Sequence, residues 1–305
     1  MSDMLVIGSR GSQLALWQAR WVQARLEERG HDCRIEIIKT TGDKITDVPL
    51  AKVGTKGLFT KEIEEALQEG RIDLAVHSLK DLPTELPAGL RLAAIPERED
   101  PRDALAGARL AELKSGAKVG TSSLRRVAQL KARRPDLVIE PVRGNLDTRL
   151  RKLAEGQYDA IVLACAGLRR LGWQNRIAEV LEPEIMCPAV GQGALAIETR
   201  RDGGAGEQAC ARLDHAASRS AVTAERAVLA ALGGGCQVPV GAHAVVDGDR
   251  LHLLAVVVTP EGTQVVRREA DGPVGEAERV GQELGERLLA SGAREILEAV
   301  YGRRV

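Results

Sequence analysis

The sequence predicts an α/β protein of two related lobes, followed by a small α+β domain. Its 305 residues are enough for two or three domains of about 100–150 residues each. Short strand-like runs alternate with helical patterns over most of the chain, which is typical of largely parallel sheets covered by helices. After residue 240, closely spaced strand patterns precede one long helical pattern, and this order favours an α+β domain.

The first lobe is expected to alternate strands with helices. Its predicted strands are residues 5–7, 34–39 and 73–77. One helix between them carries Leu14 and Trp17 at helical spacing and ends at Gly30. A second helix starts after Thr60, whose side chain can cap it, and ends near Gly70.

A second strand–helix series follows residues 92–101, which we interpret as a linker because two prolines and a charge cluster interrupt the pattern. Its predicted strands are residues 118–119, 137–140 and 159–163, and its predicted helices begin at Ser122 and Asn145. The segment from Val119 to Leu124 repeats the order seen from Ile7 to Leu14, since both run from a strand through Gly and Ser or Thr into a helix. This repeat indicates two related lobes.

Residues 183–193 form a second segment rich in proline and glycine, where the chain is expected to return to the first lobe. Two connections between lobes predict a hinged cleft. The predicted domains are domain 1 with residues 1–95 and 191–214, domain 2 with residues 96–190, and domain 3 with residues 215–305. The elements predicted for domain 3 are a helix through Ala230, strands at residues 242–246, 251–258 and 264–268, and a helix over residues 274–289.

Composition argues against several classes of function. Basic and acidic residues number 43 each, so no net charge attracts nucleic acid or a membrane. Aromatic residues make up 2% of the chain, too few for the stacking surfaces of single-strand binders. The five cysteines are widely spaced, so no metal site is predicted. No signal peptide or membrane-spanning run is evident, and a cytoplasmic protein is expected.

Cations recur where predicted strands end. The segment from Ser9 to Ser12 contains Arg10 and opens a helix, whose N-terminus attracts anions; simple capping by a serine is the alternative. Arg125 and Arg126 stand in the first turn of another helix, where cations oppose the dipole. The apolar stripe from Leu124 to Leu130 predicts the buried face of that helix, so both arginines are expected off it. A solvated basic face is the alternative there.

Further basic residues stand at other predicted strand ends, and these are Lys52, Lys56, Arg143, Arg149, Arg169 and Arg170. Ligands of open α/β sheets bind at the carboxyl ends of the strands. Because such positions occur in both lobes, the sequence predicts a polyanionic ligand.

Two residues stand out as chemical candidates. Asp81, directly after a strand, would be an ionised carboxylate among cations, able to stabilise a cationic intermediate or move protons. A turn residue before Pro83 is the alternative for Asp81. Cys236 ends a run of three glycines, which let a bulky group approach the main chain. An incidental buried cysteine is the alternative for Cys236.

Six segments together resemble the porphobilinogen deaminase family, whose members are also called hydroxymethylbilane synthases. They occur in the family's order and span nearly the whole chain. The six are residues 10–17, 77–83, 120–126, 143–149, 188–193 and 234–239.

The resemblance implies a transferase of porphyrin and haem biosynthesis. Four porphobilinogen molecules are condensed head to tail, with loss of ammonia, onto a dipyrromethane primer, and hydrolysis then releases linear hydroxymethylbilane. It also implies one dipyrromethane per chain, bound to Cys236 through a thioether. The lobes would be similar to those of periplasmic-binding proteins, and the protein would be a monomer that binds neither nucleic acid nor membrane.

The resemblance further implies roles for the matching residues, with Asp81 as the catalytic residue. Besides Cys236 and Asp81, the residues expected to bind the cofactor are Ser78, Lys80, Thr121, Ser123, Arg125, Arg126 and Gly144. Those expected to bind the substrate are Arg10, Ser12, Arg143, Arg149, Arg170 and Gln192. A lid is expected to include Lys52, Lys56 and Phe59.

Two other functions fit parts of the sequence. A non-catalytic polyanion-binding protein would explain the arginines, but it gives no reason for Cys236 or Asp81. A cysteine hydrolase would need a histidine paired with Cys236, and none of the five histidines has a motif context for that pairing.

Overall fold

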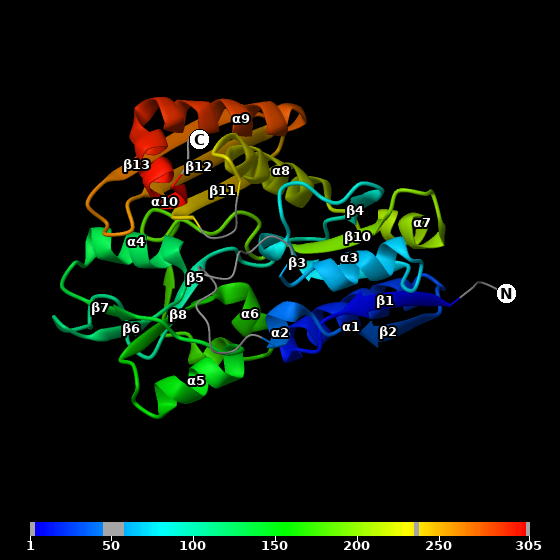
Figure 1. Ribbon diagram of the computed structural model, residues 1–305, viewed down its shortest axis with the longest axis horizontal. Helices are drawn as coiled ribbons and strands as arrows, with labels where there is room; N and C mark the ends of the chain where they lie inside the picture. The colour runs from blue at the N-terminus through cyan, green and yellow to red at the C-terminus, as the bar shows by residue number, and fades with distance from the viewer. Residues whose placement is uncertain (1–3, 45–57, 235–237, 303–305) are drawn as a thin grey trace. The chain divides into compact units, whose positions relative to one another are not determined.

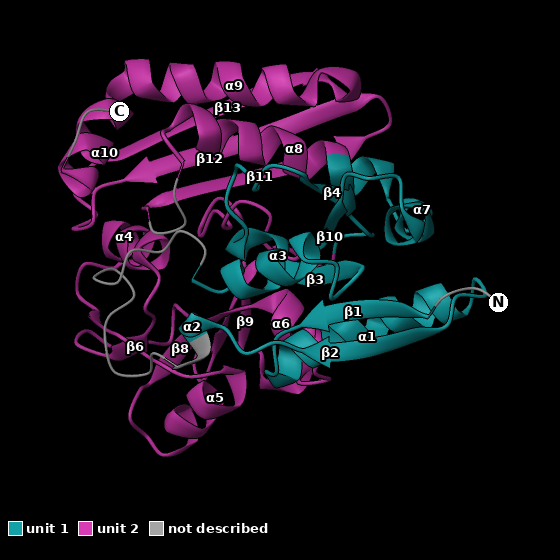
Figure 2. Cartoon of the chain, turned by 45° about the vertical axis from the view of Figure 1, so that its right-hand side comes forward, with its two compact units in different colours: residues 1–98, 194–219 teal, residues 99–193, 220–305 magenta. Residues whose placement is uncertain are grey.

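The structure, a computed structural model, describes residues 4–44, 58–234 and 238–302. Its contacts divide the chain into two compact units, which Figure 2 shows in different colours. Unit 1 comprises residues 1–98 and 194–219, and unit 2 comprises residues 99–193 and 220–305. Unit 2 therefore combines the second lobe with the C-terminal segment.

Unit 1 is built on a five-stranded sheet with the order β2-β1-β3-β10-β4 (Figure 1). Its strands are β1 (Leu5–Ser9), β2 (Cys33–Ile37), β3 (Leu74–Ser78), β4 (Leu90–Ala94) and β10 (Leu195–Arg200). In this sheet β1 runs parallel to β2 and β3, whereas β10 runs antiparallel to both of its neighbours, β3 and β4. The helices of the unit are α1 (Gln13–Glu27), α2 (Thr41–Lys44), α3 (Lys61–Gln68), the 3-10 helix η2 (Leu79–Asp81) and α7 (Ala205–Ala211).

Helices cover both faces of this sheet because its strands are apolar on both sides. Val22 of α1 and Ala209 of α7 pack with Leu74 on one face. Ile63 of α3 packs with Ala75, the next residue of β3, on the other face. Alternate residues of one strand therefore belong to different cores, as the period of a β-strand requires.

Unit 2 contains a second five-stranded sheet, with the order β7-β6-β8-β5-β9. Its strands are β5 (Asp103–Ala106), β6 (Lys118–Gly120), β7 (Val138–Glu140), β8 (Ala160–Ala164) and β9 (Glu179–Leu181). Its helices are α4 (Leu124–Arg133), α5 (Leu146–Ala154), α6 (Cys165–Arg170) and the 3-10 helix η3 (Gln174–Arg176). Here β6 runs parallel to β7 and β8, and β5 runs antiparallel to both of its neighbours, β8 and β9.

The two sheets share one topology. In each, three parallel strands are followed by one antiparallel strand and then by an outer strand. The antiparallel strands, β10 and β5, are the first strands that the chain forms after crossing from the other lobe. This shared order agrees with the internal repeat found in the sequence, and the predicted α/β class is confirmed. Four strands that the sequence patterns do not predict are β4, β5, β9 and β10.

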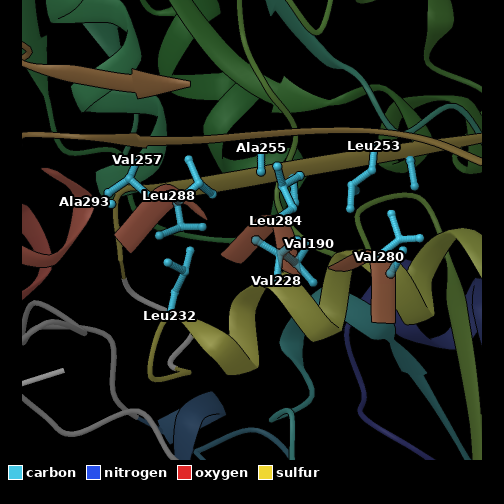
Figure 3. Close-up of a cluster of buried hydrophobic side chains, with 14 of the residues drawn as sticks. Val190, Val228, Leu232, Leu253, Ala255, Val257, Val280, Leu284, Leu288 and Ala293 are labelled. Carbon is cyan, nitrogen blue, oxygen red and sulfur yellow. The ribbon is translucent and has the colours of Figure 1, made fainter. Parts of the chain in front are cut away.

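The C-terminal part of unit 2 is a three-stranded antiparallel sheet with helices, as predicted for the small α+β domain. Its strands are β11 (Val240–Asp247), β12 (Arg250–Val258) and β13 (Val265–Pro273). Its helices are α8 (Ala216–Ala231), which begins in unit 1, η4 (Val274–Glu276), α9 (Ala277–Leu288), a π-helical turn (Leu289–Ala293) and α10 (Arg294–Tyr301). Figure 3 shows Val228 of α8 and Leu284 of α9 in one core with Ala255 of β12.

The other face of the three-stranded sheet packs against the second lobe. Leu254 and Val256 of β12 share a buried cluster with Ala128 of α4 and with Cys187. Gly241 of β11 is close to this contact, because a Cβ atom there would lie 2.8 Å from the Cys187 carbonyl oxygen. Helix α4 is thus held between two sheets of the same unit.

Candidate active site

In unit 1 the strand order reverses between β1 and β3, and sheets of this kind bind ligands beyond the strand ends at such a reversal. Arg10 and Ser12 lie in the connection between β1 and α1. The Ser12 hydroxyl accepts a hydrogen bond from the Ala15 N–H at 3.3 Å. Ser12 therefore caps the helix, as the alternative interpretation of the sequence held.

The neighbouring connection, after β3, carries Lys80 and Asp81 on the short helix η2. Ser78 ends β3, and its Oγ accepts a hydrogen bond from Gln18 Nε2 of α1 at 2.9 Å. Asp81 is exposed and Lys80 is partly exposed. Polar side chains predicted from the sequence thus follow the carboxyl ends of two neighbouring strands, β1 and β3.

Phe59, the only phenylalanine of the chain, contacts Arg10. The Cζ of Arg10 lies 4.3 Å from the centre of the Phe59 ring, within the range in which a guanidinium group is attracted to a ring face. Lys52 and Lys56, the other residues of the expected lid, lie outside the described residues. The structure therefore places Phe59 beside an expected substrate-binding arginine.

In unit 2 the strand order reverses between β6 and β8. Thr121 and Ser123 follow β6; Thr121 is buried, and its Oγ1 accepts a hydrogen bond from the Ser123 N–H at 3.2 Å. Arg170, at the end of α6, donates from Nη2 to the Gly193 carbonyl oxygen at 2.7 Å. Burial lowers the pKa of Arg170 to about 10. In the second sheet β6 and β8 hold the places of β1 and β3 in the first sheet. Thr121, Ser123 and Arg170 therefore follow strands that correspond to those of the first site.

The expectation that Arg125 and Arg126 lie off the buried face of their helix is wrong. They are only 4% and 6% exposed, respectively. Helix α4 is covered on two sides, because Leu130 packs into the core of the second sheet while Ala128 packs against β12. Both guanidinium groups pair at 2.7 Å with Asp103, which is fully buried.

One donor of this arginine pair is unsatisfied. Within the described parts of the chain, the buried Nε of Arg125 has no hydrogen-bond partner. Most buried polar groups in proteins are paired, and an unpaired one is costly.

A further arginine lies close to the same pair. Burial, and then the charges of Arg126 and Arg143, lowers the pKa of Arg149 to about 10. Arg149 Nε donates to the carbonyl oxygen of Gly144 at 2.8 Å. Gly144 has a φ of 107°, which favours glycine at that position. Mutually repelling guanidinium groups of this kind favour the binding of a polyanion.

Cys236 lies outside the described residues, so its surroundings are not shown. The preceding residues Gly233 and Gly234 have φ values of 88° and 68°, and the Tyr301 hydroxyl donates a hydrogen bond to the Gly234 carbonyl. Burial raises the pKa of each of the other thiols to about 11 or 12, namely Cys33, Cys165, Cys187 and Cys210. These four thiols are therefore protonated near neutral pH and are poor nucleophiles.

The described residues show neither a membrane-spanning helix nor a cluster of metal ligands. None of the helices there is both long and apolar enough to cross a membrane. Nor do three His, Cys, Asp or Glu side chains gather in those parts of the chain as ligands for a metal ion.

Comparison with known protein families covers nearly the whole chain. A family model described as "Porphobilinogen deaminase, dipyromethane cofactor binding domain" matches residues 5–207. A second, described as "Porphobilinogen deaminase, C-terminal domain", matches residues 220–290. The chain belongs to the porphobilinogen deaminase family.

Curated relatives agree with this membership of the porphobilinogen deaminase family. The porphobilinogen deaminase of Trichlorobacter lovleyi is 52% identical over 305 residues, covering 99% of this chain and 98% of the relative. Those of Pelobacter propionicus and Geobacter metallireducens are both 53% identical over 305 residues; each covers 99% of this chain, and 98% and 96% of the relatives, respectively.

Solved structures give a more distant match. A periplasmic substrate-binding protein of an ABC transporter from Coxiella burnetii matches with a TM-score of 0.43 and 14% identity, over 69% of this chain and 91% of that one. Likeness at that level says nothing about what this chain binds.

The sequence analysis missed Asp103, which the structure places at the centre of the arginine cluster of this porphobilinogen deaminase family member. The residue follows the run Glu99-Asp100-Pro101-Arg102, which reads as a charged linker. The available signal was the following run Ala104-Leu105-Ala106, which is apolar and forms β5. A carboxylate at the start of a buried strand needs a cationic partner.

Proposed function

We propose that this chain condenses four porphobilinogen molecules head to tail, with loss of ammonia, on a dipyrromethane held by Cys236, and releases linear hydroxymethylbilane. The observation that carries the proposal is the buried arginine cluster of unit 2, in which the Nε–H of Arg125 lacks an acceptor among the described residues. Each pyrrole of the product carries an acetate and a propionate. Carboxylates are the acceptors that guanidinium groups bind most strongly and most directionally.

The donor-rich character of this cluster fits a dipyrromethane. In this proposal Cys236 holds the group through a thioether, and its carboxylates are bound by side chains that donate hydrogen bonds. Once bound, the group supplies the primer pyrrole to which new units are added. The residues proposed to hold it are Ser78, Lys80, Asp81, Thr121, Ser123, Arg125, Arg126 and Gly144.

Asp81 is proposed as the catalytic residue. Loss of ammonia from porphobilinogen develops positive charge on the pyrrole, and a fixed carboxylate stabilises such charge. Asp81 is exposed at the end of β3, where α/β sheets bind their ligands. The residues proposed to bind the incoming substrate are Arg10, Ser12, Arg143, Arg149, Arg170 and Gln192.

The rest of the proposal concerns the whole protein. We take it to be a cytoplasmic monomer that carries one dipyrromethane per chain and uses Lys52, Lys56 and Phe59 as parts of a lid. The proposal also includes a hinged cleft between the lobes and domain boundaries near residues 95, 190 and 214.

Ammonia release from porphobilinogen tests this function. The purified protein should release one ammonia for each porphobilinogen consumed and one linear tetrapyrrole for every four. Cys236→Ala, assayed under the same conditions, should lose this activity. Binding of porphobilinogen without ammonia release would support a non-catalytic polyanion-binding protein instead. Full activity of Cys236→Ala would contradict the role of the thiol.

A further inference from the structure

Asp103 accepts hydrogen bonds from both buried arginines. It begins β5 and has no exposed surface. Its Oδ2 accepts a bond from Arg125 Nη1 at 2.7 Å. Its Oδ1 accepts bonds from Arg126 Nε at 3.0 Å and Nη2 at 2.7 Å. Gln192 Nε2 donates to the same Oδ1 at 2.9 Å.

These donors engage both oxygens of Asp103. An ionised carboxylate offers about four lone-pair positions; Oδ1 accepts three of the bonds and Oδ2 accepts one. Since carboxylates also repel one another, Asp103 is not a group that a polyanionic ligand would contact. Any effect of Asp103 on ligand binding must therefore pass through its hydrogen-bond donors, which are the two arginines and Gln192.

The two arginines differ in which of their guanidinium nitrogens are hydrogen-bonded within the protein. Arg126 also donates from Nη1 to the Val162 carbonyl oxygen at 2.9 Å, so each of its three nitrogens is bonded. Arg125 donates from Nη1, to Asp103 and to the Cys187 carbonyl oxygen at 2.6 Å. Its Nε–H remains without a partner among the described residues.

The second acceptor of Arg125 is itself held in place. The side-chain amide of Gln129 donates to the Cys187 carbonyl oxygen at 3.0 Å and accepts a bond from the Cys187 N–H at 2.8 Å. Both groups that orient Arg125, the Asp103 carboxylate and the Cys187 carbonyl, are therefore buried and fixed. A guanidinium group oriented in this way loses little conformational freedom when it binds a ligand.

The charge balance of the cluster also favours an anion. Burial alone would raise the pKa of Asp103, but Arg125 and Arg126 hold that pKa well below its usual range. Asp103 is therefore ionised at neutral pH. One carboxylate facing two guanidinium groups leaves one net positive charge in the interior, which an anionic ligand would neutralise.

We infer that Asp103 is a positioning residue, which holds Arg125 and Arg126 so that their remaining N–H groups are fixed for the carboxylates of a pyrrole ligand before it arrives. This inference rests on the proposed function. The competing explanation is that Asp103 only stabilises the fold by pairing with buried cations.

The test is the loading of apo-protein from cells that make no porphobilinogen. The protein is titrated with porphobilinogen, and intact mass records the gain of two pyrrole units. In Asp103→Asn the new amide points N–H groups at guanidinium groups, so one arginine must move. We expect half-loading to need at least tenfold more porphobilinogen than in the wild type. Asp136→Asn is the matched control, because Asp136 also pairs with an arginine of the second lobe, Arg134, but at the surface.

A comparison of combined variants separates positioning from stability. If Asp103 acts through Arg125 and Arg126, then Asp103→Asn should add little to the loading defect of a protein that carries both Arg125→Lys and Arg126→Lys. A purely structural role predicts independent effects that multiply, and this result would overturn the inference. So would Asp103→Asn protein that melts at a lower temperature but loads at wild-type concentrations.

Asp103→Glu keeps the test decisive if Asp103→Asn does not fold. It retains the charge but shifts the carboxylate by one methylene. We expect a loading defect of at least threefold, whereas loading at wild-type concentrations would contradict positioning. If wild-type protein gains no pyrrole mass, the proposed function itself fails; if it loads and the Asp103 variants load equally well, only this inference fails.

Discussion

At the scale of single residues, Asp81 can be changed without disturbing a core, because it is exposed on a three-residue helix. We expect Asp81→Ala to lower kcat about 10²–10³-fold, the loss typical of removing one group that stabilises developing charge. The free energy of unfolding should change by no more than about 0.5 kcal/mol, as for other surface substitutions. Ammonia release and thermal melting measure the two quantities. Glu85→Ala, an exposed acidic residue of the same lobe, is the control, and an equal loss of kcat in both variants would argue against a specific role.

A buried acidic residue of unit 1 predicts a pH effect on stability. Glu64 of α3 is 7% exposed, and burial, followed by the charge of Glu198, raises its pKa above the ordinary value of 4.5. The folded state therefore binds this proton more tightly than the unfolded state does. As the pH rises from the unfolded pKa through the folded pKa, the free energy of unfolding falls.

We accordingly expect Glu64→Gln to raise the melting temperature at pH 7, where it removes a buried charge, and to have little effect near pH 3, where the native carboxyl is protonated. Thermal melts across this range measure the difference. Glu65→Gln, an exposed change on the same helix, should show no such pH dependence. A stabilisation by Glu64→Gln that is as large at pH 3 as at pH 7 would mean that the charge is not its cause.

The sequence could identify Arg125 and Arg126 as candidates but could not predict their burial. The apolar stripe of α4 correctly places Leu130 in a core. Periodicity within one helix does not reveal that a second sheet covers another side, where Ala128 packs. Asp103 was missed because the charged run before it resembles a linker, although the apolar residues 104–106 after it are a signal for a buried strand.

At the scale of elements, the contact between the β12–β13 hairpin and α4 can be tested with two glycines. Gly262 has a φ of 76°, and a Cβ atom there would lie 2.4 Å from the backbone nitrogen of Ala132 in α4. Gly248, in the β11–β12 turn, has a φ of 58° but open space around it. The two positions thus share the backbone strain and differ in packing.

Gly248→Ala should cost about 1–2 kcal/mol of folding free energy from its left-handed backbone alone. Gly262→Ala should cost at least about 1 kcal/mol more, because the added methyl forces the hairpin away from α4. Denaturant unfolding of both variants measures the difference. Equal costs would show that the hairpin does not pack on α4 in solution.

Strands that follow a crossing were the elements hardest to predict. The run of residues 103–106 is short, starts with a charge and follows a proline-containing linker, so no alternation marks it as β5. The parallel strands β1, β3 and β8 could be predicted because each contains an apolar run that leads into a helical segment. The prediction of β6 at residues 118–119 rests instead on their place before Gly120 and the following helical pattern. Pairing of β5 and β10 with distant strands decides their structure, and local sequence carries no record of that pairing.

At the scale of the whole molecule, the second lobe and the C-terminal domain form one compact unit. The residues that join them, such as Ala128 and Leu254, are ordinary apolar residues in the sequence. The sequence therefore predicted three domains from changes in composition, but it had no means of predicting which of them share a buried contact. The grouping places the helix that carries Arg125 and the strands that follow Cys236 in the same unit.

The intact mass of the purified protein tests the central claim most directly. The account predicts that wild-type protein exceeds the mass of its sequence by two pyrrole units, and that Cys236→Ala has the sequence mass alone. Each of the other four cysteines should be replaceable without loss of the added mass. A fully active protein with no added mass, or an added mass that survives Cys236→Ala, would contradict the account.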